Sequence, residues 1–245
     1  MENASIEQTL VLIKPDALKL SLTGYILMQL SESHTGLRFA GLKVVHVSRM
    51  LAEEHYREHA GKKFYPGLID YLMGKKHYAD TPQKRRVIAI AYNGADAIGK
   101  IRRICGPTDP HEAREQAPGT IRALGTLIMV KDAEGNLVRE RIDNLIHASA
   151  NGADAEREIK LWFKPTDIMP YMQRYPTQQC EEHYYVKDGR LSTAYAPGSI
   201  CLLAPGDVAW ASDLEALHAI EKGLPCKTAL NAVAAKYLIN TAREE

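Results

Sequence analysis

Short apolar runs alternate with helical patterns along the first part of the chain, and this alternation restricts the fold. The run Thr9–Ile13 ends at Lys14-Pro15, which predicts a buried strand stopped by proline. Residues 87–92 form the clearest strand pattern, and residues 38–47 alternate loosely as another strand. Helical patterns lie between or after these strands, at 22–30, 51–59, from 62 onward and at 95–105. The order β-α-β-α-α-β-α predicts an α+β fold, a split β-α-β sandwich with helices on one face of the sheet.

A hairpin and a short strand follow this alternation. Residues 126–131 and 137–142 flank turn residues that include glycine, which indicates a β-hairpin. The stretch from Asn144 to Ser149 predicts a strand end that delivers a histidine to a loop. A helix through residues 156–162 follows it, and the segments together predict one domain at residues 8–175.

The rest of the chain, residues 176–245, has a different composition, with several tyrosines and Pro-Gly turns. Helical patterns cover 213–221 and 228–241, and Asp213 is a candidate N-cap. No motif that carries chemistry is evident there. We expect a partly helical extension of unknown role, with two helices packed on the main domain or across a subunit interface.

Composition and charge argue for a soluble protein with a local ligand site. The 245 residues include 31 basic and 30 acidic side chains, so no global field attracts nucleic acid or anionic lipid. The basic segment 75–86 lacks interleaved aromatic residues and is expected to be a solvated loop. No signal peptide or membrane-spanning run is evident, which predicts a cytoplasmic protein. The four cysteines lack Cys-x-x-Cys spacing and are expected to be free thiols.

One short motif allows a zinc site. His55, Glu58 and His59 form His-x-x-Glu-His, the ligand order of inverted zinc proteases. Two histidines four residues apart on a helix share a face and can bind zinc. Short patterns recur by chance, however, and no later helix offers a clear third ligand, so an exposed amphipathic helix is the favoured interpretation.

A second pattern, around His147, suits nucleophilic chemistry. The hydroxyl of Ser149 lies two residues later, and the carboxylate of Glu158 lies on the following helix. A neutral imidazole attacks phosphorus without first losing a proton from the attacking nitrogen, provided that other groups hold the ring. With nine histidines in the chain, His147 alone carries little weight.

Residues elsewhere supply what a nucleoside triphosphate needs. Two guanidinium forks, an ammonium group and a hydroxyl lie at strand ends, helix faces or turns, on Arg102, Arg122, Lys14 and Thr108. Phe64 precedes a helix and can stack on a base. Each of these residues taken alone is more commonly part of a surface ion pair or a core aromatic. Together with His147 they indicate a phosphate-binding site.

These motifs together resemble the nucleoside diphosphate kinases. They occur in the family's order across about residues 8–171: Ile13-Lys14-Pro15-Asp16, Glu54-His55-Tyr56, Lys63-Phe64 with Gly67-Leu68, Gly106 and Thr108, Pro118-Gly119-Thr120-Ile121-Arg122, Asn144-x-x-His147-x-Ser149 and Glu158-Ile159-x-Leu161-Trp162-Phe163. Several short motifs in register are far more specific than any one of them.

The resemblance implies a ferredoxin-like βαββαβ sandwich with an antiparallel sheet and a ping-pong transfer through phosphohistidine at His147. Tyr56 and Glu158 are then expected to flank and orient the imidazole, with Ser149 supporting Glu158. Lys14 and Asn144 are expected at the ribose and β-phosphate. The remaining nucleotide contacts implied are stacking by Phe64 and phosphate binding by Arg102, Thr108 and Arg122. Mg²⁺ is expected on the phosphates of ATP and other nucleotides, and a homo-oligomer built from dimers is implied.

The sequence departs from the family pattern in three places. Ala148 and Ala150 replace the expected glycine and aspartate beside the nucleophile. The hairpin at 126–142 and the extension at 176–245 are additions. An active nucleoside diphosphate kinase is the favoured interpretation; the alternative is a catalytically weakened nucleotide-binding regulatory or scaffold protein, and a zinc peptidase is a distant third.

Overall fold

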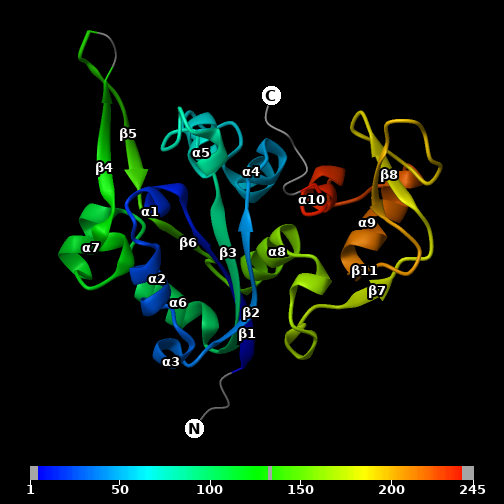
Figure 1. Cartoon of the computed structure of the whole chain (residues 1–245), viewed down its shortest axis with the longest axis horizontal. Helices are drawn as coiled ribbons and strands as arrows, with labels where there is room; N and C mark the ends of the chain where they lie inside the picture. The colour runs from blue at the N-terminus through cyan, green and yellow to red at the C-terminus, as the bar shows by residue number, and fades with distance from the viewer. Residues whose placement is uncertain (1–4, 132–133, 239–245) are drawn as a thin grey trace.

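A four-stranded antiparallel sheet forms the centre of the molecule. The computed structural model describes residues 5–131 and 134–238 (Figure 1). The sheet has the order β2-β3-β1-β6. Its strands are β1 (Ile6–Ile13), β2 (Arg38–Val45), β3 (Val87–Ala95) and β6 (Ile146–Ala148). This order and the antiparallel pairing are those of a ferredoxin-like fold, which confirms the predicted fold class.

Both faces of the sheet are covered, because side chains of β1 alternate between two cores. Val11 and Ile13 pack on one face, while Leu10 and Leu12 pack on the other. The crossover helices lie on the first face: α1 (Pro15–Lys19), α2 (Thr23–Gln29), α3 (Glu32–Thr35) and α6 (Ala97–Cys105). Helices α4 (Arg49–His55), α5 (Tyr65–Leu72) and α8 (Gly152–Trp162) cover the second face. The expectation that the helices lie on one face of the sheet was therefore wrong.

Local capping sets where the helices near the site begin and end. The Ser48 side chain accepts a hydrogen bond from the Leu51 backbone N–H at the start of α4, and Asn151 caps α8 in the same way through Asp154. The expected helix at 51–59 stops at His55, and a short 3₁₀ helix (Arg57–His59) follows it. His55 and His59 therefore do not share one α-helical face.

The predicted hairpin is present and projects away from the sheet (Figure 1). Strands β4 (Thr126–Lys131) and β5 (Leu137–Asp143) pair antiparallel, after helix α7 (Pro110–Gln116) and a 3₁₀ turn (Ile121–Leu124). The segment 75–86, expected to be a solvated loop, contains a 3₁₀ turn (Pro82–Lys84) and the buried His77. His77 contacts Asp143 at the end of β5, so this part of the expectation was wrong.

The extension contains more strand than the sequence suggested. Strands β8 (Tyr184–Lys187), β9 (Arg190–Ser192) and β10 (Ile200–Leu203) form one sheet, and β7 (Thr177–Gln179) pairs with β11 (Val208–Trp210). The helices are α9 (Ala211–Glu221) and α10 (Leu230–Ala234). Asp213 does not cap α9: it lies in the first turn and its buried carboxylate bonds Lys236. The predicted 228–241 helix is much shorter, and 239–241 lie outside the described residues.

The extension packs beside α4 and α8, two of the helices that cover the second face of the main sheet (Figure 1). Trp210 is fully buried in the same core cluster as Trp162, and its indole N–H donates to the Phe163 carbonyl at 2.8 Å. Ala235, just after α10, belongs to that cluster as well. The expectation that the extension packs on the main domain is therefore confirmed.

The expectations for thiols and membrane segments can also be compared with the structure. All four cysteines are free thiols, with Cys105 and Cys180 buried and Cys201 and Cys226 exposed. Of the helices in the described ranges, none combines the length and the apolar character required to cross a bilayer.

Candidate active site

His147 sits at the centre of the edge strand β6, opposite Leu12 of β1. Leu145 immediately precedes β6, and its backbone turns sharply into the strand. It has a φ of 68°, a left-handed conformation that costs a non-glycine residue about 1–3 kcal/mol. Two contacts fix it: the Leu145 N–H donates to Asp16 at 2.8 Å, and its carbonyl accepts from the Lys14 N–H at 2.9 Å. Strand pairing and this fixed turn together hold His147 in place.

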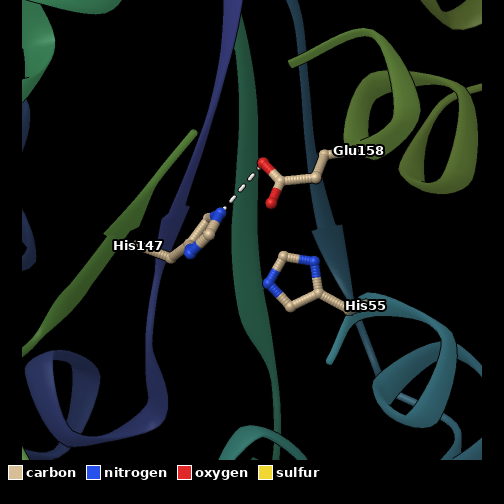
Figure 2. Close-up of side chains that lie close together, drawn as sticks. All are labelled: His55, His147 and Glu158. Atoms are coloured by element: carbon tan, nitrogen blue, oxygen red, sulfur yellow. Dashed lines mark hydrogen bonds and ion pairs between the residues drawn. The ribbon is translucent and has the colours of Figure 1, made fainter. Parts of the chain in front are cut away.

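The imidazole of His147 is oriented by a carboxylate. Its Nε2 lies 3.0 Å from Oε2 of Glu158, which also accepts a 2.7 Å hydrogen bond from the Ser149 hydroxyl (Figure 2). Burial alone raises the pKa of the Glu158 carboxyl, but the adjacent His147 and the Ser149 hydrogen bond outweigh it and lower that pKa to about 2. An ionised carboxylate only accepts hydrogen bonds, so the proton of neutral His147 resides on Nε2 and the Nδ1 lone pair is free.

A second imidazole, His55, contacts the first. The two ring centroids are 4.5 Å apart in an edge-to-face arrangement, and Figure 2 shows His55, His147 and Glu158 converging from three elements. The Trp162 indole N–H donates to His55 Nδ1 at 3.2 Å. Burial holds the pKa of His55 well below its ordinary value, so this ring is neutral with its proton on Nε2. That buried Nε2 has no hydrogen-bond partner in the structure.

The same three residues lie close enough together to form a metal site, but the protonation of His55 does not suit metal binding. Ligand atoms of His55, His147 and Glu158 all lie within 4.8 Å of one another. A metal needs a lone pair, and both nitrogens of His55 are committed: Nδ1 accepts from Trp162 and Nε2 carries the proton. The His-x-x-Glu-His zinc site fails too, because His55 is buried while His59 stacks against Tyr56 nearer the surface.

One cavity of about 720 Å³ gathers nearly all the predicted site residues. Its lining includes Lys14, Tyr56, Phe64, Arg102, Thr108, Arg122, Asn144, His147 and Glu158. Ser149 is fully buried behind Glu158, in the supporting position expected for it. A volume of this size suits a nucleotide-sized ligand.

Lys14 and Asn144 form one unit at the base of the cavity. The Lys14 ammonium donates to the Asn144 side-chain oxygen, and the Asn144 amide donates to the Thr108 carbonyl at 2.8 Å. Burial lowers the pKa of Lys14 to about 8, although the charge of Asp16 opposes this shift. The ammonium is thus desolvated and directed into the cavity, where an anion restores its preference for the charged state.

Arg122 and Arg102 differ in their surroundings. Arg122 is buried and donates to the carbonyls of Gly106 and Ile146, at 2.8 and 3.3 Å, while its Nε has no partner in the structure. It therefore ties the loop after α6 to the strand that carries the nucleophile. Arg102, on α6, is exposed at the cavity wall. Both guanidinium groups give this end of the cavity a positive charge.

Aromatic rings form the other end. Phe64 lies just before α5 and is 52% exposed, with its ring against His59 at 5.6 Å between centroids. Tyr56 packs edge-on against His55 at 4.6 Å. An exposed phenyl ring at a cavity mouth is suited to stacking on a planar ligand.

The two substitutions beside the nucleophile have different surroundings. Ala148 is a buried residue of β6 paired with Val11, and its φ is not positive, so it does not need the conformational freedom of glycine. Ala150 is exposed on the cavity wall. The backbone at Ala148 therefore suits the strand that holds His147.

Sequence reasoning missed several residues of the cavity. His55 and Arg157 were within recognised motif segments, but only the fold brings them to His147 and Glu158. Lys76, Arg141 and Ile142 also line the cavity, and they come from the presumed loop and from the hairpin. The clustering of basic residues on segment 75–86 was the one available signal for Lys76.

Comparison with known proteins gives one consistent result. The family model described as nucleoside diphosphate kinase matches residues 7–168. A nucleoside diphosphate kinase of Pyrococcus furiosus is 39% identical over 166 residues, covering 68% of this chain and 88% of that protein. The Aquifex aeolicus enzyme structure has a TM-score of 0.53 at 30% identity, covering 67% of this chain and 100% of the other. The transition-state mimic of the Borrelia burgdorferi enzyme with vanadate and ADP has a TM-score of 0.50 at 28% identity, covering 69% and 93%.

Proposed function

The chain belongs to the nucleoside diphosphate kinase family, an enzyme family of nucleotide phosphotransfer, and we propose that its own transfer runs through a phosphohistidine at His147. The observation that carries this proposal is the pairing of His147 Nε2 with Glu158. Because that pairing fixes the proton on Nε2, Nδ1 is the nucleophilic atom, and it belongs to a cavity lined with cations. Ser149 and Glu158 orient the ring but do not react.

The reaction divides into two balanced half-reactions. Nδ1 of His147 forms a bond to the γ-phosphorus of a nucleoside triphosphate while the bond from that phosphorus to the bridging oxygen breaks, and the nucleoside diphosphate leaves. In the second half, a terminal phosphate oxygen of an acceptor diphosphate attacks the same phosphorus and the N–P bond breaks, which regenerates His147. Lys14, Arg102 and Arg122 neutralise charge on the phosphates, and Thr108 and Asn144 position them.

Glu158 makes the imidazole suitable for both steps. When Nδ1 becomes bonded to phosphorus, the ring gains positive character, and the ionised Glu158 beside Nε2 stabilises it. Tyr56 lines the same cavity as the nucleophile, and we expect Phe64 to stack on the base. Since stacking reads only the face of a base, we propose broad base tolerance.

The residues present fit a Mg²⁺ ion that arrives on the nucleotide. The phosphate end of the cavity is lined by cationic and neutral donors, which suit phosphate oxygens rather than a metal cage. Within the described ranges, no group of three carboxylates is close enough to hold the ion alone. Glu58 and Asp154 also line the cavity, and the Asp154 carboxylate is engaged by Asn151 and Arg157. When bound, the ion supplies charge neutralisation across the phosphates.

The regulatory or scaffold alternative is not favoured. It rested on Ala148 and Ala150, and Ala148 sits in ordinary strand backbone. The contacts among His147, Glu158 and Ser149 are intact, and the cationic side chains are in place. The family members matched are themselves described as kinases.

Labelling tests the proposed intermediate directly. With γ-labelled ATP and Mg²⁺, the protein should acquire an acid-labile, alkali-stable label on a peptide containing His147, and addition of GDP should move the label to GTP. Chelation of the metal should suppress both events. Nucleotide binding without any label would overturn the proposal.

The pH dependence should report Lys14. Because its pKa in the free protein is about 8, its charge is lost as pH rises through that value, and kcat/KM should fall about tenfold between pH 7 and 9. The stability contribution has the opposite sign: a depressed lysine pKa makes the folded state bind fewer protons, so stability rises over the same range. Unfolding therefore does not explain the loss. Lys14→Arg, with a guanidinium that stays charged, should flatten the alkaline limb; an unchanged limb contradicts the assignment.

We also propose assembly from dimers. Strand β2 is one of the two outer strands of the sheet, with Leu42 and Val44 each 52% exposed. An exposed apolar edge strand is a template for pairing with another chain. Sedimentation equilibrium should give a mass that is an even multiple of the chain mass, and a monomer at micromolar concentration contradicts the proposal.

A further inference from the structure

A buried tyrosine lies against the ammonium of Lys14. The Nζ of Lys14 is 4.7 Å from the centroid of the Tyr71 ring, and Tyr71 lines the same cavity. Tyr71 belongs to α5 and is 3% exposed. A cation over an aromatic ring is attracted by the negative face of that ring, most strongly where water is excluded. The proposed reaction uses Lys14 to bind phosphate but gives Tyr71 no role.

The Tyr71 ring is itself fixed. Its hydroxyl donates to Asp16 Oδ2 at 2.7 Å, and the same oxygen accepts from the Leu145 N–H at 2.8 Å. Asp16 is 1% exposed and lies in the first turn of α1. The ring also packs against His77, with 5.2 Å between centroids. Because hydrogen bonds to a carboxylate are short and strong, the hydroxyl contact fixes the orientation of the ring.

The same contacts reach the strand of the nucleophile. The Lys14 N–H donates to the Leu145 carbonyl at 2.9 Å, and Leu145 immediately precedes β6, which carries His147. Asp16 therefore binds both the Tyr71 hydroxyl and the turn into β6. The aromatic ring, the ammonium and this turn form one connected unit, so a change in the position of the ring moves the cation relative to the nucleophile.

The ammonium needs such support because burial disfavours its charge. Burial lowers the pKa of Lys14 to about 8, and among the nearby charges Asp16 opposes this shift most strongly. Tyr71 stays neutral, because burial and the charge of Asp16 hold its pKa well above the ordinary value. Among the described residues, the charged and titratable groups that face Lys14 from the surrounding elements are Asp16, His55, Tyr71, Cys105, Arg122 and Asp143.

We propose that Tyr71 is a positioning residue for Lys14, whose ammonium its ring holds at the base of the cavity. The proposal rests on the proposed function, because it takes the phosphates of a nucleotide as the anion that Lys14 binds. Tyr71 acts through Lys14 rather than on the substrate. Its ring keeps the desolvated cation charged and in one place before the anion arrives, and the contact with Asp16 keeps the ring in register with the turn into β6.

The pH dependence of MgADP binding, measured by calorimetry, tests this role. The wild-type affinity should fall as the pH rises through about 8, where Lys14 of the free protein loses its charge. Tyr71→Leu removes the aromatic face, so its midpoint should lie about one pH unit lower. At about pH 6, where Lys14 is charged in both proteins, the two affinities should agree within about threefold. Tyr71→Phe keeps the face but loses the Asp16 contact, so its midpoint should lie closer to wild type than to Tyr71→Leu.

Tyr65→Leu is the matched control. Tyr65 lies on the same helix and packs against the same side of the sheet, but it does not line the cavity. The same substitution there should leave the midpoint unchanged. Nuclear magnetic resonance of the wild-type protein needs no variant that must fold: the ε-methylene protons of Lys14, identified by their absence in Lys14→Arg, should resonate upfield of other lysines because they lie over the ring. Titration of that signal gives the Lys14 midpoint without nucleotide.

Four results overturn the proposal. An unchanged midpoint in Tyr71→Leu removes the ring from the support of Lys14, and an equal shift in Tyr65→Leu makes the effect a general loosening of α5. A shift in Tyr71→Phe as large as that in Tyr71→Leu assigns the effect to the hydroxyl, and a Lys14 signal without an upfield shift places the ammonium away from the ring. Labelling of His147 separates the two proposals: a wild-type protein without label defeats the proposed reaction, whereas the Lys14 midpoints decide the role of Tyr71.

Discussion

His147→Gln should lower nucleoside diphosphate kinase turnover by a factor of about 10⁴ or more, the scale of loss when a nucleophile is removed. Glutamine retains an amide that can still reach Glu158, but it has no nitrogen lone pair able to attack phosphorus. The variant should bind ADP within about threefold of the wild-type affinity, because His147 does not carry the charges that hold the phosphates. Turnover is measured by a coupled assay with ATP and a second diphosphate, and binding by calorimetry.

The matched control for this prediction is His218→Gln. His218 is an exposed residue on α9, in the extension, so its replacement should leave turnover within twofold. A stable phosphoryl label on the His147→Gln protein would place the nucleophile on another residue. Loss of both turnover and ADP binding would instead indicate that the substitution had damaged the cavity as a whole.

Asp213→Asn should cost about 3–5 kcal/mol of folding free energy, the usual cost of leaving a buried charge without its partner. The Lys236 side chain is 1% exposed, and its ammonium lies 2.8 Å from Asp213. Burial lowers the pKa of Lys236 and raises that of Asp213, so desolvation outweighs the attraction within the pair. Urea unfolding followed by circular dichroism measures the loss.

A double replacement separates burial from specific pairing. Because desolvation dominates, Asp213→Leu with Lys236→Met should recover at least half of the stability lost in Asp213→Asn. Glu53→Gln is the control, since the exposed Arg49–Glu53 pair should contribute less than about 0.5 kcal/mol. A loss below about 1 kcal/mol for Asp213→Asn means that the Asp213–Lys236 pair does not stabilise the fold of the extension. Two separate unfolding transitions would support the predicted division into two domains at residue 175. A single transition would mean that the main domain and the extension unfold as one cooperative unit.

The central strands and most helices could be predicted because their patterns are local. The apolar run before Lys14 and the run at 87–92 are continuous enough to give strands. The break of α4 after His55 could not be predicted, since the sequence there remains compatible with a helix and tertiary contacts of the buried ring decide where it ends. Asp213 was misassigned for a similar reason: its partner lies far along the chain.

In the candidate site too, the features set by residues close in sequence could be predicted, and those set by distant contacts could not. His147, Ser149 and Glu158 lie close in sequence, and the predicted support of Glu158 by Ser149 matches the hydrogen bond between them. The protonation of His55 could not be deduced, because it depends on Trp162 of another helix. Arg141 lies near the end of β5, on the hairpin. Its contact with the cavity follows from the packing of Asp143 on His77, which the sequence does not encode locally.

Helix α8 carries Glu158 and Trp162 one turn apart, so a single rigid body determines where the proton sits on two imidazoles. Its C-terminal end is in turn held by Trp210 through the Phe163 carbonyl. Linkage between such contacts is reciprocal. Whatever free energy the packing of the extension on α8 adds to nucleotide affinity, a bound nucleotide adds to the packing of the extension. The protein with bound nucleotide should therefore pack residues 176–238 against the main domain more stably than the protein without nucleotide.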